Sequence, residues 1–114
     1  MGKALSALKS QEEAFARIER FLSRARDRCK ELGWEFIGLY LVGSRARGDY
    51  LANSDIDLVL VVKGVKSLKM LQRLEALKDI LEPGIDLRIY DAEEWFNSKS
   101  AWIKKLREEA IEIK

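Results

Sequence analysis

The chain has 114 residues, the length of a single domain, and 47% of them are hydrophobic, which is enough for a core without disulfide bonds. Its 21 Lys and Arg residues against 19 Asp and Glu residues leave a net charge of +2, so overall charge does not indicate a nucleic-acid binder. The sequence has no histidine, which excludes histidine general bases and most zinc sites. Any acid–base or metal chemistry must therefore use carboxylates.

The composition also indicates a compartment. The one cysteine, Cys29, cannot form an internal disulfide and is typical of a reducing cytoplasm. The first residues carry charge and predict no signal peptide, and no apolar run approaches the ~20 residues of a membrane span. We expect one cytoplasmic domain over residues 1–114.

An amphipathic helix is predicted over residues 11–32, after a polar stretch at 1–10 that we expect to fray. Apolar residues recur in this helix at spacings of three and four, which places them on one face: Phe15, Ile18, Leu22, Ala25, Cys29 and Leu32. Free cysteines are usually buried and inert, so Cys29 is interpreted as a core residue rather than a reactive thiol.

Two apolar runs, at residues 34–42 and 54–62, are predicted to be strands. Their nearly continuous apolar character is typical of strands buried on both faces. The segment between them begins with a small-residue turn at Gly43 and Ser44, followed by one helical turn over residues 45–48 and a loop over 49–53.

The second half of the chain alternates helices and strands. A helix is predicted over residues 67–81, with its inward side formed by Leu68, Leu71, Leu74 and the segment from Leu77 to Leu81. A strand follows over 85–90, then a short helix from its N-cap Asp91 to Asn97, a helix over 100–109 and an edge strand over 110–113. Three aromatic residues near the C-terminus, Trp95, Phe96 and Trp102, could pack in the core or form an interface, and the sequence leaves both open.

This order of elements predicts an α/β (α+β) fold, in which a small mixed sheet lies in a two-layer or three-layer sandwich. The N-terminal helix takes residues 1–33, the central strands and helix take 34–90, and the C-terminal helices take 91–114.

Two aspartates, Asp55 and Asp57, lie two residues apart in the second predicted strand. Their side chains point to the same face, ~6.5 Å apart along the chain. Carboxylates held so close repel each other, and one takes up a proton unless a cation neutralises both. Without histidine or a cysteine cluster, the preferred ion is Mg²⁺ or Mn²⁺. The alternative for this pair alone is an exposed strand end with two solvated acids.

A third carboxylate would complete such a site, and Asp86 is the best candidate because it lies on the polar face of an apolar strand. Its alternative is an ordinary ion pair, for example with Arg88. Asp91, Glu93 and Glu94 compete with Asp86, but they lie near a helix start, where acids commonly serve as caps.

The turn before the aspartates has features of a phosphate-binding site. Gly43 and Ser44 allow the backbone to approach an anion closely, and N–H groups at the start of a helix point toward it. Arg45 and Arg47 add positive charge, although residues two apart on a helix diverge, so only one need face the site. The alternative is simple turn formation.

This stretch resembles the DNA polymerase β-like nucleotidyltransferases, and more narrowly the minimal nucleotidyltransferases of prokaryotes. The family pattern is Gly-Ser, one residue, Ala-Arg-Gly, a five-residue loop and Ser-Asp-x-Asp-Leu. The matching segments here are Gly43-Ser44-Arg45-Ala46-Arg47-Gly48, residues 49–53, and Ser54-Asp55-Ile56-Asp57-Leu58. The third carboxylate of the family corresponds to Asp86, in a less specific sequence context.

The resemblance implies a nucleotidyltransferase fold and a two-metal mechanism. ATP would bind with its phosphates on Gly43 and Ser44, while Arg47 and Ser54 support the loop or a phosphate. The catalytic residues would be the three carboxylates, which hold two Mg²⁺ ions: Asp55, Asp57 and Asp86. One ion would bind the triphosphate, and the other would activate an acceptor hydroxyl that attacks the α-phosphate as pyrophosphate leaves.

The resemblance also implies a partner. Minimal members often pair with a helical HEPN protein in type VII-like toxin–antitoxin modules, where the nucleotidyltransferase is the antitoxin and adds AMP to a tyrosine of the HEPN ribonuclease. The ribonuclease motif Arg-x4–6-His needs a histidine, so this chain is not the HEPN protein. We expect a HEPN partner or a homo-oligomer, and no membrane association.

Two other functions stay open. The chain could be a non-catalytic module that binds nucleotide, or that neutralises its partner by docking alone. It could also transfer nucleotides to a small molecule or RNA at a site formed by oligomerisation, although no stripe of basic and aromatic residues favours RNA.

Overall fold

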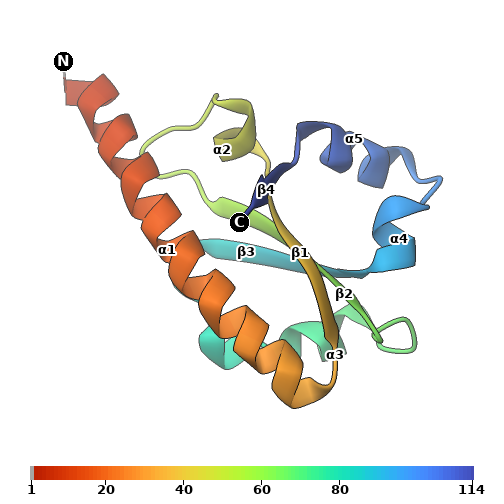
Figure 1. Cartoon of the computed structure of the whole chain (residues 1–114). Coiled ribbons are helices and arrows are strands. Elements are labelled where there is room, and N and C mark those ends of the chain that lie inside the picture. Colours follow the sequence, from red (N-terminus) through yellow and green to blue (C-terminus); the bar gives the residue numbers. More distant parts are fainter. Residues whose placement is uncertain (1) are drawn as a thin grey trace.

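The computed structural model describes residues 2–114, with side chains from residue 6 onward, so of the stretch 1–10 that is expected to fray, residue 1 lies outside the described residues. Figure 1 shows a small sheet with one long helix lying along it. The elements in chain order are α1 (Gly2–Leu32), β1 (Glu35–Val42), α2 (Ser44–Arg47), β2 (Ile56–Lys63), α3 (Met70–Glu75), the 3-10 helix η1 (Lys78–Ile80), β3 (Ile85–Asp91), α4 (Ala92–Phe96), α5 (Ala101–Glu109) and β4 (Ile111–Ile113).

The sheet is mixed, with the strand order β3-β2-β1-β4. β1 runs antiparallel to β2 and β4, whereas β2 and β3 are parallel and are connected by a crossover through α3 and η1. In this register Val42 at the end of β1 pairs with Asp57, and Asp57 pairs with Asp86 on β3. The Gly43 turn and two of the aspartates therefore meet at one end of the sheet.

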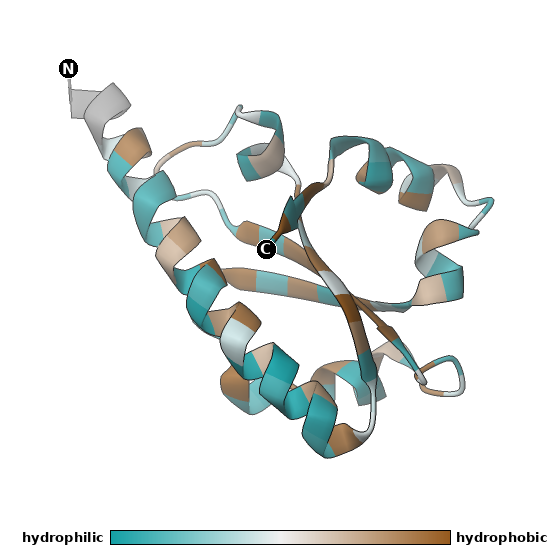
Figure 2. Ribbon diagram, in the orientation of Figure 1, coloured by the Kyte–Doolittle hydropathy of each residue, from teal (hydrophilic) through white to brown (hydrophobic). Residues whose placement is uncertain are grey.

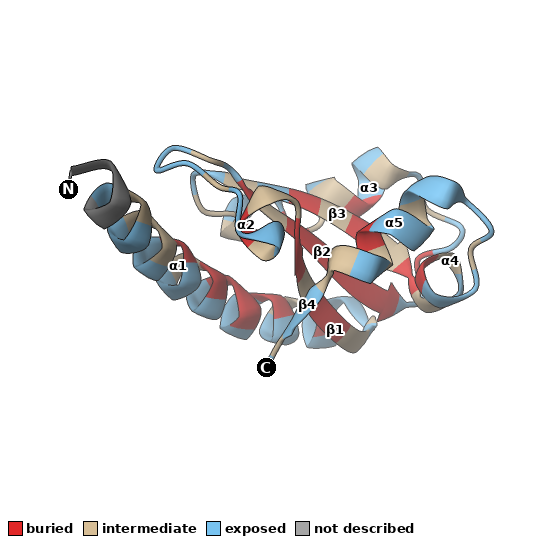
Figure 3. Cartoon of the chain, turned by 90° about the horizontal axis from the view of Figure 1, so that it is seen from above, coloured by how far each residue is buried: buried red, intermediate tan, exposed pale blue. Residues whose placement is uncertain are grey.

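Helices cover both faces of the sheet, so the predicted sandwich has three layers. One face packs on α1, α3 and η1, and its core includes the fully buried Ile18 and Phe21. On the other face, Val59 meets Trp95 of α4 and Leu106 of α5. Figure 2 shows hydrophobic residues concentrated along the strands, and Figure 3 shows buried residues on the sheet and on the side of α1 that faces it.

The first helix is longer than predicted. α1 begins at Gly2 rather than near residue 11, because the early residues are helix formers without a proline and no stop signal separates them from the amphipathic part. The buried side is also rotated slightly: Ala14 and Phe21 are buried, whereas Phe15 and Leu32 are 36% and 40% exposed. Cys29 is buried as expected, and burial raises the pKa of its thiol to about 11, which makes it inert.

The helix predicted over residues 67–81 is wrong in length. The structure has α3 and the separate η1, because the Arg28 side chain of α1 donates a 2.7 Å hydrogen bond to the carbonyl oxygen of Ala76 between them. The predicted inward residue Leu71 is 77% exposed. Arg73 is buried in its place, since it forms an ion pair with Glu94 and a hydrogen bond to the backbone of β3.

The C-terminal elements follow the prediction closely. Asp91 caps α4 by accepting a hydrogen bond from the Glu93 N–H group, and β4 pairs with β1 at the sheet edge. Of the three aromatic residues, Trp95 is a core residue at 1% exposure, while Phe96 and Trp102 are 46% and 53% exposed. Within the described part of the chain, no helix has the length and apolarity needed to cross a membrane.

Candidate active site

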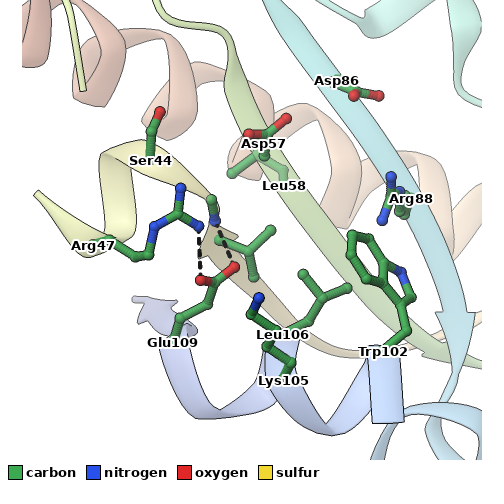
Figure 4. Close-up of a pocket in the computed structure, with 12 residues that line it drawn as sticks. Ser44, Arg47, Asp57, Leu58, Asp86, Arg88, Trp102, Lys105, Leu106 and Glu109 are labelled. Carbon is green, nitrogen blue, oxygen red and sulfur yellow. Dashed lines mark hydrogen bonds and ion pairs between the residues drawn. The ribbon is translucent and has the colours of Figure 1, made fainter. Parts of the chain in front are cut away.

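A cavity of about 370 Å³ opens where the ends of three strands meet α5 (Figure 4). This volume falls within the roughly 300–1,000 Å³ of small-molecule sites. The lining residues come from the turn after β1, from the starts of β2 and β3 and from one side of α5: Val42, Gly43, Ser44, Arg47, Asp57, Leu58, Asp86, Arg88, Trp102, Lys105, Leu106 and Glu109. Five of the seven predicted site residues lie in this cavity, and Ser54 and Asp55 do not.

Gly43 brings the turn into direct contact with Asp57. Its backbone angles, φ 76° and ψ −157°, lie in a region that is essentially restricted to glycine. A Cβ atom at this position would lie 2.3 Å from Oδ2 of Asp57, closer than two such atoms can approach. Glycine is therefore required here both for the backbone conformation and for the space beside the carboxylate.

Asp57 holds its negative charge in an unfavourable environment. Burial raises the pKa of its carboxyl, and the nearby charges of Asp86 and Asp55 raise it further, while Arg88 and Arg47 oppose the shift. The interactions that raise the pKa are the larger ones. A cation placed beside Asp57 would relieve this repulsion.

Asp86 lies opposite Asp57 in the parallel register and is exposed at the cavity. It takes part in no ion pair among the described residues, so the ordinary ion-pair role considered for it is not seen. The competing acids serve the structure instead. Asp91 caps α4 and Glu94 pairs with Arg73, as their position near a helix start predicts.

Asp55 and Ser54 precede β2 rather than lying in it. Asp55 is exposed, and its charge is close enough to raise the pKa of Asp57. Ser54 stabilises the loop, because its hydroxyl accepts a 2.8 Å hydrogen bond from the N–H group of Leu51. Of the two roles considered for Ser54, this geometry corresponds to holding the loop.

The carboxylates fit a magnesium site that substrate phosphates complete. In the described part of the chain, no three acidic, histidine or cysteine side chains converge closely enough to hold a metal alone. Mg²⁺ in nucleotide sites is usually bound by one or two carboxylates together with phosphate oxygens. Asp57 and Asp86 supply two carboxylates in one cavity, and burial together with the charges of Asp86 and Asp55 raises the pKa of Asp57.

The two arginines of the turn have different positions. Arg45 is buried and faces α1, where it donates hydrogen bonds to Oε1 of Gln11 at 2.9 Å and to the carbonyl oxygen of Ser54 at 2.8 Å. Arg47 is half-exposed and lines the cavity. As expected for residues two apart on a helix, the two side chains diverge: Arg45 packs in the fold and Arg47 lines the cavity.

Glu109, at the end of α5, was not indicated by the sequence. Its carboxylate accepts hydrogen bonds from the Gly43 N–H group at 3.0 Å and from Nη1 of Arg47 at 2.9 Å (Figure 4). Burial alone would raise the pKa of Glu109, but these two hydrogen bonds, together with the charges of Arg47 and Lys105, outweigh burial and lower it. The Glu109 carboxylate therefore occupies two donors, the Gly43 N–H group and the Arg47 guanidinium, in the turn that was predicted to bind phosphate. No local signal could have found Glu109, which lies 66 residues from Gly43 in the sequence.

Comparisons with known proteins identify the family of the chain. The model of the nucleotidyltransferase domain family matches residues 22–108, so the chain belongs to this family and is a transferase of the nucleotidyl type. Its structure is similar to the 1.40 Å crystal structure of a presumed nucleotidyltransferase from Sulfolobus solfataricus, with a TM-score of 0.75 and 27% sequence identity over 98% of this chain and 89% of that one. No curated protein matches the sequence.

Proposed function

We propose that the protein transfers a nucleoside monophosphate, AMP from ATP, to a hydroxyl group in a Mg²⁺-dependent reaction. One observation carries this proposal: Gly43 packs so tightly against Asp57 that the donors of the turn and the carboxylates share one cavity. Nucleotidyl transfer needs this combination, because the phosphates need donors while the reacting phosphorus needs a metal beside it.

The turn would bind the terminal phosphates. The Gly43 N–H group and the Arg47 guanidinium now donate to the Glu109 carboxylate, and a phosphate oxygen can replace a carboxylate oxygen on the same donors. Ser44 lines the same end of the cavity and adds a hydroxyl donor. α2 has only four residues, so these individual donors, rather than a helix dipole, would hold the phosphates.

The carboxylates would serve the reacting atoms. Asp57 and Asp86, joined by Asp55 after a change in its side-chain orientation, would hold Mg²⁺, which supplies charge stabilisation at the α-phosphate and lowers the pKa of the acceptor hydroxyl. The acceptor oxygen forms a bond to the α-phosphorus, and the bond to the β-phosphate oxygen breaks with its electron pair leaving on pyrophosphate. Asp86, the more exposed of the cavity aspartates, would take the acceptor proton.

The acceptor in this proposal is a tyrosine of a HEPN-domain protein, which would make the chain the antitoxin of a toxin–antitoxin pair. Support comes from the minimal nucleotidyltransferase pattern of residues 43–58 and from the exposure of Asp86, which a hydroxyl on another protein can reach.

Label transfer tests the proposal. The purified chain is incubated with α-³²P-labelled ATP, Mg²⁺ and a HEPN protein that carries the Arg-x4–6-His motif. We expect label on a tyrosine of the HEPN protein, and we expect none with the double variant D55N/D57N or in EDTA. Loss of HEPN ribonuclease activity without any label, equally strong for the double variant, would favour the non-catalytic docking function instead.

A further inference from the structure

One side of α5 forms a wall that runs the length of the cavity. Trp102, Lys105, Leu106 and Glu109 follow the spacing i, i+3, i+4, i+7, so they share one face of the helix. Glu109 contacts the Gly43 turn at one end, and Trp102 lies seven residues away, about 10 Å along the helix axis. Asp57 and Asp86 lie across the cavity from this wall, with Asp86 toward the end that holds Arg88 and Trp102 (Figure 4).

The end of the cavity opposite the turn carries two planar groups. The Arg88 guanidinium of β3 lies 5.1 Å from the centre of the Trp102 ring. Trp102 lines the cavity and is nevertheless 53% exposed. Anchoring of α5 on the sheet does not require this ring, because Leu106, which is 6% exposed, packs in the core of that face.

The charges at this end match a nucleotide. Neither Arg88 nor Lys105 forms an ion pair with any carboxylate in the described part of the chain. Lys105 lies on the same wall between Trp102 and Glu109, where a ligand that extends from the turn to the ring would place a phosphate or a ribose. The cavity therefore presents phosphate donors at one end, cations along its wall and an aromatic ring at the other end.

We propose that Trp102, which has the Arg88 guanidinium over one face of its ring, offers the other face as the platform on which the base of the nucleoside triphosphate stacks. This inference rests on the proposed function and adds the subsite for the base. Stacking between a base and an aromatic side chain is strong and works with any base, because every base has a π face. The alternative is that Trp102 stacks on the ring of an acceptor tyrosine. In that case the affinity for the nucleotide would not depend on Trp102.

Binding of two ligands to matched variants tests the proposal. Calorimetric titrations with Mg²⁺ measure the affinity for ATP, which has a base, and for tripolyphosphate, which has none. The variants are W102A, W102F and the control F96A, which removes an exposed aromatic residue outside the cavity. We expect W102A to weaken ATP binding about tenfold while tripolyphosphate binding stays unchanged. W102F should keep most of the ATP affinity, and F96A should match the wild type.

Fluorescence gives a second readout that does not depend on the alanine variant folding. ATP should quench tryptophan emission in the wild type, and W102F should lose this quenching because neither of the other two tryptophans, Trp34 and Trp95, lines the cavity. An unchanged ATP affinity in W102A, or an equal loss for both ligands, would overturn the base platform while leaving the proposed function standing. If the wild type binds neither ATP nor tripolyphosphate in Mg²⁺, the proposed function fails and the base platform fails with it.

Discussion

Two glycines of the turn segment have positive φ angles but differ in what surrounds them. Gly43 faces the Asp57 carboxylate, whereas a Cβ atom added to Gly48, at φ 91°, would meet nothing within 4 Å. We expect G43A to lose Mg²⁺-dependent binding of tripolyphosphate and all transfer activity, because the added methyl group displaces either the turn or Asp57. G48A should cost only about 1 kcal/mol of stability for its backbone conformation and should keep binding. Calorimetry and chemical unfolding of both variants measure this difference, and equal binding by G43A and G48A would contradict it.

If the Gly43 turn binds phosphate as proposed, Glu109 is an intramolecular competitor for the same donors. Its lowered pKa keeps it anionic at neutral pH on the donors of Gly43 and Arg47. E109Q removes the charge but keeps the size, so we expect tripolyphosphate to bind about tenfold more tightly to this variant, a gain of roughly 1.4 kcal/mol. The control is E108Q, which changes an exposed neighbour outside the cavity. Weaker binding by E109Q would instead show that the carboxylate positions Arg47 for the phosphate.

At the scale of elements, α2 separates a structural arginine from one that lines the cavity. Arg45 connects α2 to α1 through a hydrogen bond to Gln11 and to the loop before β2 through hydrogen bonds to Ser54, whereas Arg47 lines the cavity. R45K should destabilise the protein by about 2 kcal/mol, because a lysine leaves buried acceptors without partners. R47K should change stability by less than about 0.5 kcal/mol and weaken tripolyphosphate binding. Thermal unfolding and calorimetry separate the two effects, and a reversed pattern would contradict the assignment.

The contact between α1 and η1 should depend on pH. Arg28 of α1 donates hydrogen bonds to Asp79 at 2.7 Å and 2.8 Å and thereby lowers the pKa of that carboxyl from 3.8 to about 2. A lowered pKa in the folded state means that the contact stabilises the protein above pH 3.8, and that this stabilisation is lost as the pH falls through about 2. D79N should therefore be less stable than the wild type at pH 7, and the two should converge near pH 2.

The pair is exposed, so its effect is small and screened by salt. Thermal unfolding of both proteins at several pH values in low salt and in 1 M NaCl measures it. A difference that does not shrink at low pH, or that is unchanged by salt, would assign the effect of D79N to something other than the ion pair.

Local patterns in the sequence predict most of the elements and one half of the site. The apolar runs identify β1 and β2, the Asp91 cap identifies α4, and the turn motif identifies Gly43 and Arg47. These features depend on neighbours within a few residues of each other, which is why periodicity and motif spacing find them. The general class of nucleotidyltransferase also follows from this motif, and the family match confirms it.

The remaining features depend on contacts between distant segments. α3 ends early because Arg28, 48 residues away, takes the carbonyl oxygen of Ala76, and no pattern near residue 76 shows this. Glu109 and Trp102 enter the cavity because α5 packs across the strand ends, an arrangement that the apolar spacing of α5 alone does not determine. Sequence patterns therefore did not identify the α5 wall of the cavity, which lies across from the aspartates.

At the scale of the whole molecule, the negative charge of Asp57 in the candidate site lowers the stability of the folded protein. Burial and the charges of Asp86 and Asp55 raise the pKa of Asp57 from its ordinary value of 3.8. A carboxyl whose pKa is raised in the folded state favours folding below pH 3.8, and this contribution is lost as the pH rises through the raised value. At neutral pH the ionised Asp57 therefore destabilises the ligand-free protein.

D57N should consequently unfold at a higher temperature than the wild type at pH 7 without ligand, and this advantage should disappear as the pH approaches 3.8. Mg²⁺ with ATP should reverse the order, because a ligand that binds only the folded state stabilises it, and D57N has lost the carboxylate that would hold the metal. Thermal unfolding of both proteins in EDTA and in Mg²⁺ with ATP measures the reversal. If D57N is already the less stable protein in EDTA at pH 7, the Asp57 carboxylate stabilises the ligand-free fold. That result would contradict the conclusion that burial and the neighbouring aspartates make the ionised Asp57 destabilising.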